Sequence, residues 1–147
     1  MKISNKKATF NYEIIESFEA GIMLTGAEVK SIKDNRANLT DSFVKIIGGE
    51  LYLVNADIPK YRYDGRQNYD PRRSRKLLVK KSELVQIQSK MKSKHLILIP
   101  LSMYETRGMI KVEVGLGRGR KKHEKKNREK EKDLNRELLY ESRKYVV

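Results

Sequence analysis

Alternating apolar and polar residues in the first part of the chain predict several short β-strands. Phe10, Tyr12 and Ile14 alternate with polar neighbours. A second alternation runs from Ile110 to Leu116, where apolar residues take every other position. Successive side chains of a strand point to opposite faces, so each segment has one face for a core and one for water.

Two further features indicate how strands are joined. The apolar-rich segments 43–47 and 51–54 flank a Gly-Gly pair, which is typical of a hairpin because glycine adopts the positive φ angles of a tight turn. A fifth apolar run, 96–99, is followed by Pro100. Proline cannot donate a ladder hydrogen bond, so we expect an edge strand or a bulge there.

Helical signals interrupt the strands. Thr25 and Glu28 match a capping box, and Asn35 suits a left-handed residue at the end of that helix. Ser82 can cap another helix, in which apolar residues such as Ile87 recur at helical spacing. The whole pattern predicts a mainly β, α+β fold, an OB-like β-barrel of the oligonucleotide-binding type with about three helices.

Charge divides the chain into two parts. Residues 118–147 carry 12 basic and six acidic side chains, and residues 118–133 contain no aliphatic side chain, Phe, Tyr or Trp. Such a segment has too little apolar surface to offset the entropy lost on ordering. We expect residues 1–117 to form an RNA-binding barrel and residues 118–147 a basic tail that is disordered when free.

Composition narrows the function to binding of a polyanion. The 147 residues carry a net charge of +14 and include no cysteine and only two histidines, His95 and His123. The absence of cysteine fits a reducing, cytoplasmic setting. The longest apolar run is too short to cross a bilayer, and the N-terminal residues lack the apolar core of a secretory signal. Nucleic acid is the expected partner, ahead of a membrane surface.

Catalytic motifs are missing from the sequence. The glycines at 115, 117 and 119 end a predicted strand and lead into charged residues, so they match neither a dinucleotide fingerprint nor a P-loop. His95 is placed at the start of a predicted strand, where a structural polar contact is the simpler interpretation. We therefore expect no enzyme activity, cofactor, metal site or small-molecule substrate.

Residues 60–81 form the strongest candidate binding segment. They contain nine basic residues and, interleaved with them, Tyr61, Tyr63 and Tyr69. Basic side chains neutralise phosphates and tyrosine rings stack on bases. We interpret the segment as an RNA-contacting loop. The alternative is a charged loop that contacts only solvent.

A known family shows the same ordered blocks. They are FEAGI at 18–22, Leu24, Gly26, EVKS at 28–31, ANL at 37–39, Asp41-Ser42, DPRRSRKLL at 70–78, IPL at 99–101, Tyr104, Gly108, Lys111-Val112 and GRKK at 119–122. In these blocks the chain resembles small protein B, the bacterial SsrA-binding family that partners transfer-messenger RNA (tmRNA).

This resemblance implies a function and partners. Family members have an OB-type barrel and bind the tRNA-like domain of tmRNA. They promote its charging by alanyl-tRNA synthetase and accompany it, with GTP-bound elongation factor Tu, to stalled ribosomes, where nascent chains are tagged.

The resemblance also implies site residues. Family RNA-facing positions match Glu19, Leu78 and Lys111, with expected neighbours at Arg36, Asn38, Arg72, Arg73, Arg75 and Lys76. Leu78 could instead belong to the core. Glu19, which is unusual on a face that meets a polyanion, could accept hydrogen bonds from RNA or orient a neighbouring cation.

In the family, the tail becomes helical on the small ribosomal subunit, in the empty mRNA channel and decoding centre. The resemblance assigns this contact to Lys121, Lys122, His123, Lys125, Lys126 and Arg128, with His123 stacking in the decoding centre. It gives no role to residues 134–147.

Two rival functions remain open at this point. One is a general OB-fold protein that binds rRNA or tRNA, for which ordinary tRNA should compete on equal terms with the tRNA-like domain. The other is a nuclease or RNA-modifying enzyme, for which purified protein should turn RNA over.

Overall fold

The computed structural model describes residues 1–120 of the chain. The predicted tail residues from Lys121 onward therefore lie outside the described residues. The elements are, in order, β1 (Lys2–Ser4), α1 (Ala8–Asn11), β2 (Tyr12–Ile22), α2 (Gly26–Lys33), β3 (Phe43–Ile47), β4 (Glu50–Val54), β5 (Arg75–Leu78), α3 (Lys81–Lys94), β6 (Ile97–Thr106) and β7 (Met109–Gly119).

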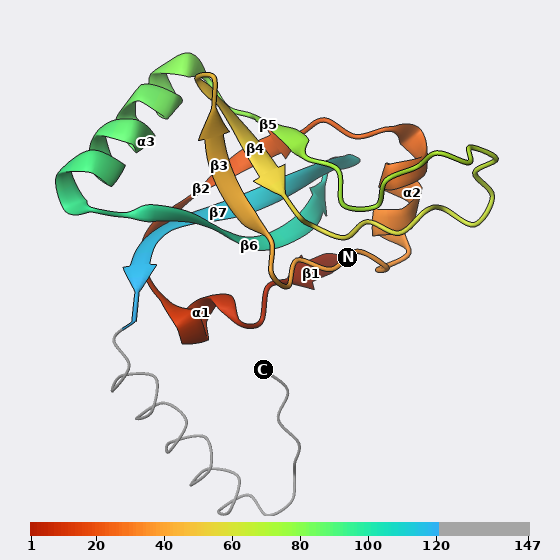
Figure 1. Ribbon diagram of the computed structural model, residues 1–147, viewed down its shortest axis with the longest axis horizontal. Coiled ribbons are helices and arrows are strands. Elements are labelled where there is room, and N and C mark those ends of the chain that lie inside the picture. Colours follow the sequence, from red (N-terminus) through yellow and green to blue (C-terminus); the bar gives the residue numbers. More distant parts are fainter. Residues whose placement is uncertain (121–147) are drawn as a thin grey trace, which may run out of the picture.

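The strands form one antiparallel seven-stranded sheet in the order β1-β6-β7-β2-β5-β4-β3. The sheet curls so that β3 crosses over β6 and contacts it (Figure 1). Helices lie around this curled sheet, with α3 near one end and α2 near the other. The predicted α+β class is confirmed, and the arrangement is consistent with an OB-like barrel.

Turns and bulges follow the predicted chemistry. Gly48 and Gly49 join β3 to β4 with φ angles of 60° and 79°, which confirms the hairpin. The β6–β7 register shifts between Pro100 and Ser102, so the bulge expected from the proline is confirmed. A second shift lies in β2 between Ile14 and Glu16.

The capping box of α2 is also confirmed. The Glu28 N–H donates to Thr25 Oγ1 at 3.2 Å, and the Thr25 N–H donates to Glu28 Oε1 at 2.9 Å. Asn35, just beyond the helix, is left-handed with a φ of 58°.

Several predicted boundaries were wrong. Helix α1 takes residues 8–11, and β2 begins only at Tyr12. Helix α3 starts before Ser82, and Glu83 accepts the hydrogen bond of the Lys80 N–H at 3.3 Å. His95 ends this helix in a left-handed conformation instead of opening β6.

Strand β7 also continues further than its apolar pattern indicated. Arg118 and Gly119 pair with Glu13 and Tyr12. Backbone pairing does not require apolar side chains, so these two residues gave no strand signal.

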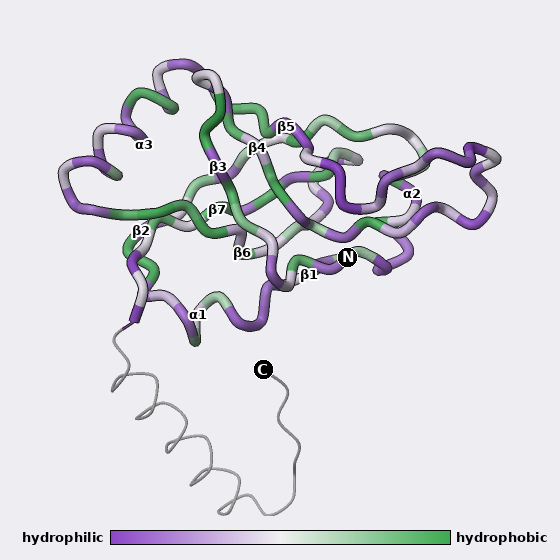
Figure 2. The backbone as a smooth tube through the Cα atoms, viewed as in Figure 1, coloured by the Kyte–Doolittle hydropathy of each residue, from purple (hydrophilic) through white to green (hydrophobic). Residues whose placement is uncertain are grey.

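The core fills the inside of the curled sheet. Its buried apolar side chains come from strands, helices and connecting segments, and include Ile22, Ile32, Leu39, Leu51, Leu53, Ile58, Leu77, Ile87, Met103, Val112 and Leu116. Hydrophobic stretches follow the strands, whereas the long connection between β4 and β5 is mostly hydrophilic (Figure 2). No helix within residues 1–120 has the length and apolar character needed to span a membrane.

Candidate nucleic-acid interface

A row of paired residues crosses the outer face of the sheet. Tyr104 pairs with Lys111, Lys111 with Gly21, and Gly21 with Leu78. Paired residues of antiparallel strands place their side chains on the same face. Four strands, β6, β7, β2 and β5, therefore present a hydroxyl, an ammonium group and an apolar side chain side by side.

The missing side chain of Gly21 leaves a hollow in this row. The hollow measures about 320 Å³ and is lined by Gly21, Ile22, Leu24, Val29, Leu78, Gly108, Met109, Ile110 and Lys111. Leu78 and Met109 are 47% and 59% exposed, so two large apolar side chains are accessible in the same hollow. Within residues 1–120 the Lys111 ammonium group has no hydrogen bond or ion pair, so its charge is available to an anion.

Glu19 contacts Tyr104, the member of the row that lies on β6. Its carboxylate accepts a hydrogen bond from the Tyr104 hydroxyl across β7. Partial burial raises the pKa of Tyr104 to about 12, and the hydrogen bond to Glu19 acts in the same direction. Tyr104 therefore stays protonated at neutral pH, and Glu19 orients a hydroxyl group instead of a cation among the described residues.

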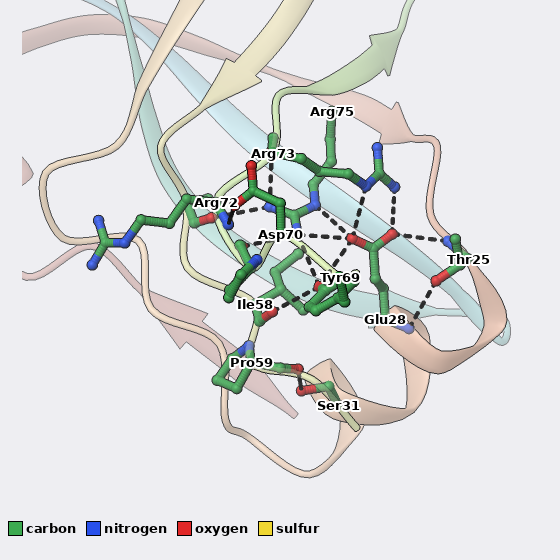
Figure 3. A network of polar contacts seen from close by, with 12 residues as sticks. Thr25, Glu28, Ser31, Ile58, Pro59, Tyr69, Asp70, Arg72, Arg73 and Arg75 are labelled. Carbon is green, nitrogen blue, oxygen red and sulfur yellow. Dashed lines mark hydrogen bonds and ion pairs between the residues drawn. The ribbon is translucent and has the colours of Figure 1, made fainter. Parts of the chain in front are cut away.

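A second cluster joins α2 to the segment before β5. Glu28 is 1% exposed and Arg75 0%, and two guanidinium nitrogens of Arg75 lie 2.9 and 2.7 Å from Glu28 Oε2 (Figure 3). Arg73 binds the same carboxylate. A buried charge is costly unless it is paired and hydrogen-bonded, and this carboxylate satisfies both conditions.

The ionisation of Glu28 reflects these contacts. Burial alone would raise the pKa of Glu28, but the Thr25 N–H and the two guanidinium groups outweigh it and lower the pKa to about 2. Glu28 is therefore a carboxylate throughout the physiological range, and it holds two arginines in place.

Arg75 ties the preceding loop to the barrel. It donates to the carbonyls of Ala56, Pro71 and Arg73 at 3.0 Å each. It also donates to the Tyr69 hydroxyl at 3.0 Å, and that hydroxyl lies 2.7 Å from the Ile58 carbonyl oxygen. The cluster thus fixes both ends of the connection between β4 and β5.

Known proteins are similar to most of this chain. A family model described as SmpB protein matches residues 2–144. The chain belongs to the SmpB family. An SsrA-binding protein of Mycobacterium bovis (strain BCG / Pasteur 1173P2) is 44% identical over 138 residues, which cover 94% of this chain and 86% of the relative.

A second relative and a solved structure are similar to this chain over most of its length. An SsrA-binding protein of Chlamydia muridarum (strain MoPn / Nigg) is 45% identical over 136 residues, covering 92% of this chain and 90% of the relative. A solved structure described as "tmRNA-SmpB: a journey to the center of the bacterial ribosome" is similar with a TM-score of 0.67 and 42% identity, covering 86% of this chain and 92% of that one.

The site residues expected from the SmpB resemblance fall into three groups in the structure: residues in or beside the row, residues in loops, and arginines that face inward. Leu78 and Lys111 line one hollow, and Glu19 joins their row through Tyr104. Leu78 is therefore on the surface and not in the core. Lys76 lies on the same strand as Leu78 and pairs with Glu50 at 2.9 Å.

Three expected residues lie in loops. Arg36 is exposed and donates to the Lys60 carbonyl at 3.3 Å. Asn38 bridges to Asp57 through its backbone. Arg72 donates to Asn55 Oδ1 at 3.3 Å and is exposed.

Two of the expected arginines face inward. Arg75 is fully buried, because alternation along β5 points it to the core side with Leu77, so the expectation that it lies on the RNA-facing surface was wrong. Arg73 is partly exposed, but its Nε and one terminal nitrogen bind Glu28. Both arginines serve the loop's conformation in this structure.

Sequence reasoning missed two residues of the site. Glu28 was identified only as a helix cap and as part of a family block, although a carboxylate is also a candidate partner for the basic segment 60–81. Tyr104 was noted only as part of the family resemblance, and its contact with Glu19 joins residues 85 positions apart. The alternation of Tyr104 with buried Met103 is the one local signal that places it outside.

Proposed function

We propose that this protein is the tmRNA-binding adaptor of ribosome rescue. It binds the tRNA-like domain of tmRNA, promotes its aminoacylation, and accompanies it to stalled ribosomes so that their nascent chains are tagged. It works in the cytoplasm by binding, with no catalytic step of its own. The observation that carries this proposal is the row around Gly21 on the outer face of the sheet, where Lys111 and Leu78, the residues that the family resemblance assigns to the RNA-facing surface, lie on either side of Gly21.

The chemistry of the row suits folded RNA. Lys111 can neutralise a phosphate, and Leu78 with Met109 offers apolar contact to a ribose or a base edge. Glu19 and Tyr104 supply an acceptor and a hydroxyl for 2′-hydroxyl groups. The other expected residues have two proposed roles. RNA contacts that flank the row are assigned to Arg36, Asn38, Arg72 and Lys76. Arg73 and Arg75 hold the connection between β4 and β5 in place.

The ribosome contact is assigned to the tail. Its basic residues from Lys121 to Arg128 would neutralise ribosomal phosphates in the mRNA channel, and His123 would stack in the decoding centre. Elongation factor Tu and alanyl-tRNA synthetase are indirect partners, reached through tmRNA.

Competition binding tests the proposal. The full-length protein is titrated with the tRNA-like domain of tmRNA over a salt series, with an elongator tRNA as competitor. We expect tight binding that persists near physiological salt and in excess tRNA. Equal competition by tRNA would indicate a general RNA-binding protein, and RNA turnover by purified protein would indicate an enzyme.

Lys111→Ala tests the row itself. Loss of one phosphate contact should weaken binding and reduce the slope of log K against log salt by about one. Lys45→Ala is the matched control, because it removes the same charge from an exposed position on β3. An equal effect of the two variants would mean that only net charge matters, and would remove Lys111 from the interface.

A further inference from the structure

The connection between β4 and β5 forms an arm with a fixed base. Ser31 Oγ donates to the Pro59 carbonyl at 2.6 Å, and the Ile58 N–H donates to the Pro71 carbonyl at 3.0 Å. Between these anchors the chain extends past α2, away from the sheet (Figure 1). The arm is therefore held where it leaves the barrel, and its tip is presented outward.

Contacts within the tip give it a defined shape. The Asp64 N–H donates to the Tyr61 carbonyl at 2.9 Å, which closes a turn. Arg66 binds the Asp64 carboxylate through two nitrogens, at 3.0 and 2.8 Å, and its guanidinium lies 5.8 Å from the centre of the Tyr69 ring. The one acidic residue of the tip is thus neutralised locally.

Two tyrosines and two cations meet at this tip. The Tyr61 and Tyr63 rings are 5.4 Å apart at an angle of 71°, an edge-to-face pair. Lys30 Nζ lies 5.5 Å from the centre of Tyr61, and the Arg62 guanidinium 5.8 Å from that of Tyr63. Each ring is therefore oriented by a neighbour.

Tyr63 is nevertheless 76% exposed, the highest value among the large hydrophobic side chains of residues 1–120. A ring in that position contributes little to the core, although its apolar faces would gain from burial. The cations beside it favour an anionic ligand, and the flat ring favours a planar one. A nucleotide combines both properties.

We propose that Tyr63 is a stacking platform for an unpaired nucleobase of the bound RNA, with Arg62 and Lys30 facing the adjoining phosphates. The inference rests on the proposed function and adds a second RNA contact to it, on the arm beyond α2. Base stacking on an exposed aromatic ring tolerates any base sequence, so the contact strengthens binding without reading a base.

Tyr63→Ala and Tyr63→Phe test the platform, with the tRNA-like domain of tmRNA as ligand. Loss of the ring should weaken binding on the order of tenfold, whereas Phe keeps the ring and should stay within about twofold of wild type. The salt slope should not change for Tyr63→Ala, since a neutral ring displaces no counterions. Arg62→Ala should make the slope shallower.

Controls separate stacking from folding. Thermal melting of Tyr63→Ala should match wild type, because the ring is mostly exposed. Val85→Ala, which trims a side chain 64% exposed on α3, should leave RNA binding unchanged.

Failure of this inference differs from failure of the proposed function. Suppose that wild type prefers the tRNA-like domain. If Tyr63→Ala then binds this domain as well as wild type does, or if Tyr63→Phe loses as much affinity as Tyr63→Ala, the stacking platform is overturned and the adaptor function stands. If wild type shows no preference over elongator tRNA, the adaptor function itself fails.

Discussion

Glu28 shows how one residue can serve both the fold and the binding segment. Its backbone and carboxylate complete the cap of α2, and the same carboxylate pairs with two arginines that precede or begin β5. Because Arg75 is fully buried, removing its partner would leave an uncompensated charge inside the protein. Glu28 therefore stabilises the barrel and the base of the arm together.

We expect Glu28→Gln to lower the free energy of unfolding at neutral pH by about 3 kcal/mol. The pKa of Glu28 is about 2, against an ordinary value of 4.5. The carboxylate's contribution is therefore complete above pH 4.5 and is lost as the pH falls towards 2. Urea unfolding of wild type and variant at several pH values measures this, and the difference between them should shrink over that interval.

Glu83→Gln is the control for this prediction. Glu83 caps α3 through the Lys80 N–H, and glutamine can replace it there. The control should cost well under 1 kcal/mol, because the capping contact is at an exposed helix end. Equal losses in the two variants would contradict a special role for the buried pair.

At the scale of elements, the outer row depends on strand register. Gly21 stands between Lys111 and Leu78, and a Cβ added to it would lie 3.4 Å from Leu78 Cβ and 3.6 Å from Leu78 Cδ1. These are close to ordinary van der Waals distances, so the sheet has room for a Cβ atom there. The glycine is thus suited to keeping the hollow open.

Gly21→Ala should narrow the hollow and leave the fold intact. Alanine adds only the Cβ atom for which there is room, so the melting temperature should change little, whereas affinity for the tRNA-like domain should fall by about threefold. Calorimetric melting and RNA titration measure the two effects. Unchanged affinity would show that RNA does not reach the hollow. Gly49→Ala is unsuitable as a control, because the positive φ of 79° would itself strain the variant.

Sequence patterns correctly predicted those elements that are determined by residues close together in the chain. The Gly-Gly turn, the Thr25–Glu28 cap and the alternation in β7 each depend on residues that are neighbours in the chain. Alternation along β5 places Arg75 on the same side as Leu77, but its full burial could not be predicted in this way, because it depends on a carboxylate 47 positions earlier. The four-residue helix α1 was missed because the alternation that starts at Phe10, inside this helix, continues without a break into β2.

The geometry of the site also depends on residues that are far apart in the chain, so local patterns could not predict it. Lys111 and Leu78 were found by family resemblance, and their shared hollow appears only when β7, β2 and β5 are paired. Tyr63 was noted for its place in a basic segment, but its exposure and its pairing with Tyr61 are properties of the folded arm.

At the scale of the whole molecule, Arg120 is hydrogen-bonded to the first helix of the barrel. The Arg120 N–H donates to the Asn11 carbonyl at 3.0 Å, and its Nε donates to the Thr9 carbonyl at 3.0 Å. Residues 1–120 also hold +10 of the net charge of +14. A functional cut therefore belongs after Arg120, because a cut after Gly117 would remove two pairs of the β2–β7 ladder.

Truncation after Arg120 should separate RNA binding from ribosome rescue. The shortened protein keeps the row, the arm and most of the charge, so its affinity for the tRNA-like domain should stay within about threefold of full length. It lacks the residues assigned to the mRNA channel, so tagging of nascent chains on stalled ribosomes should be abolished. Filter binding and a reconstituted tagging reaction measure the two properties side by side. Normal tagging by the shortened protein would remove the tail from the mechanism, and loss of RNA affinity would show that the tail is part of the RNA interface.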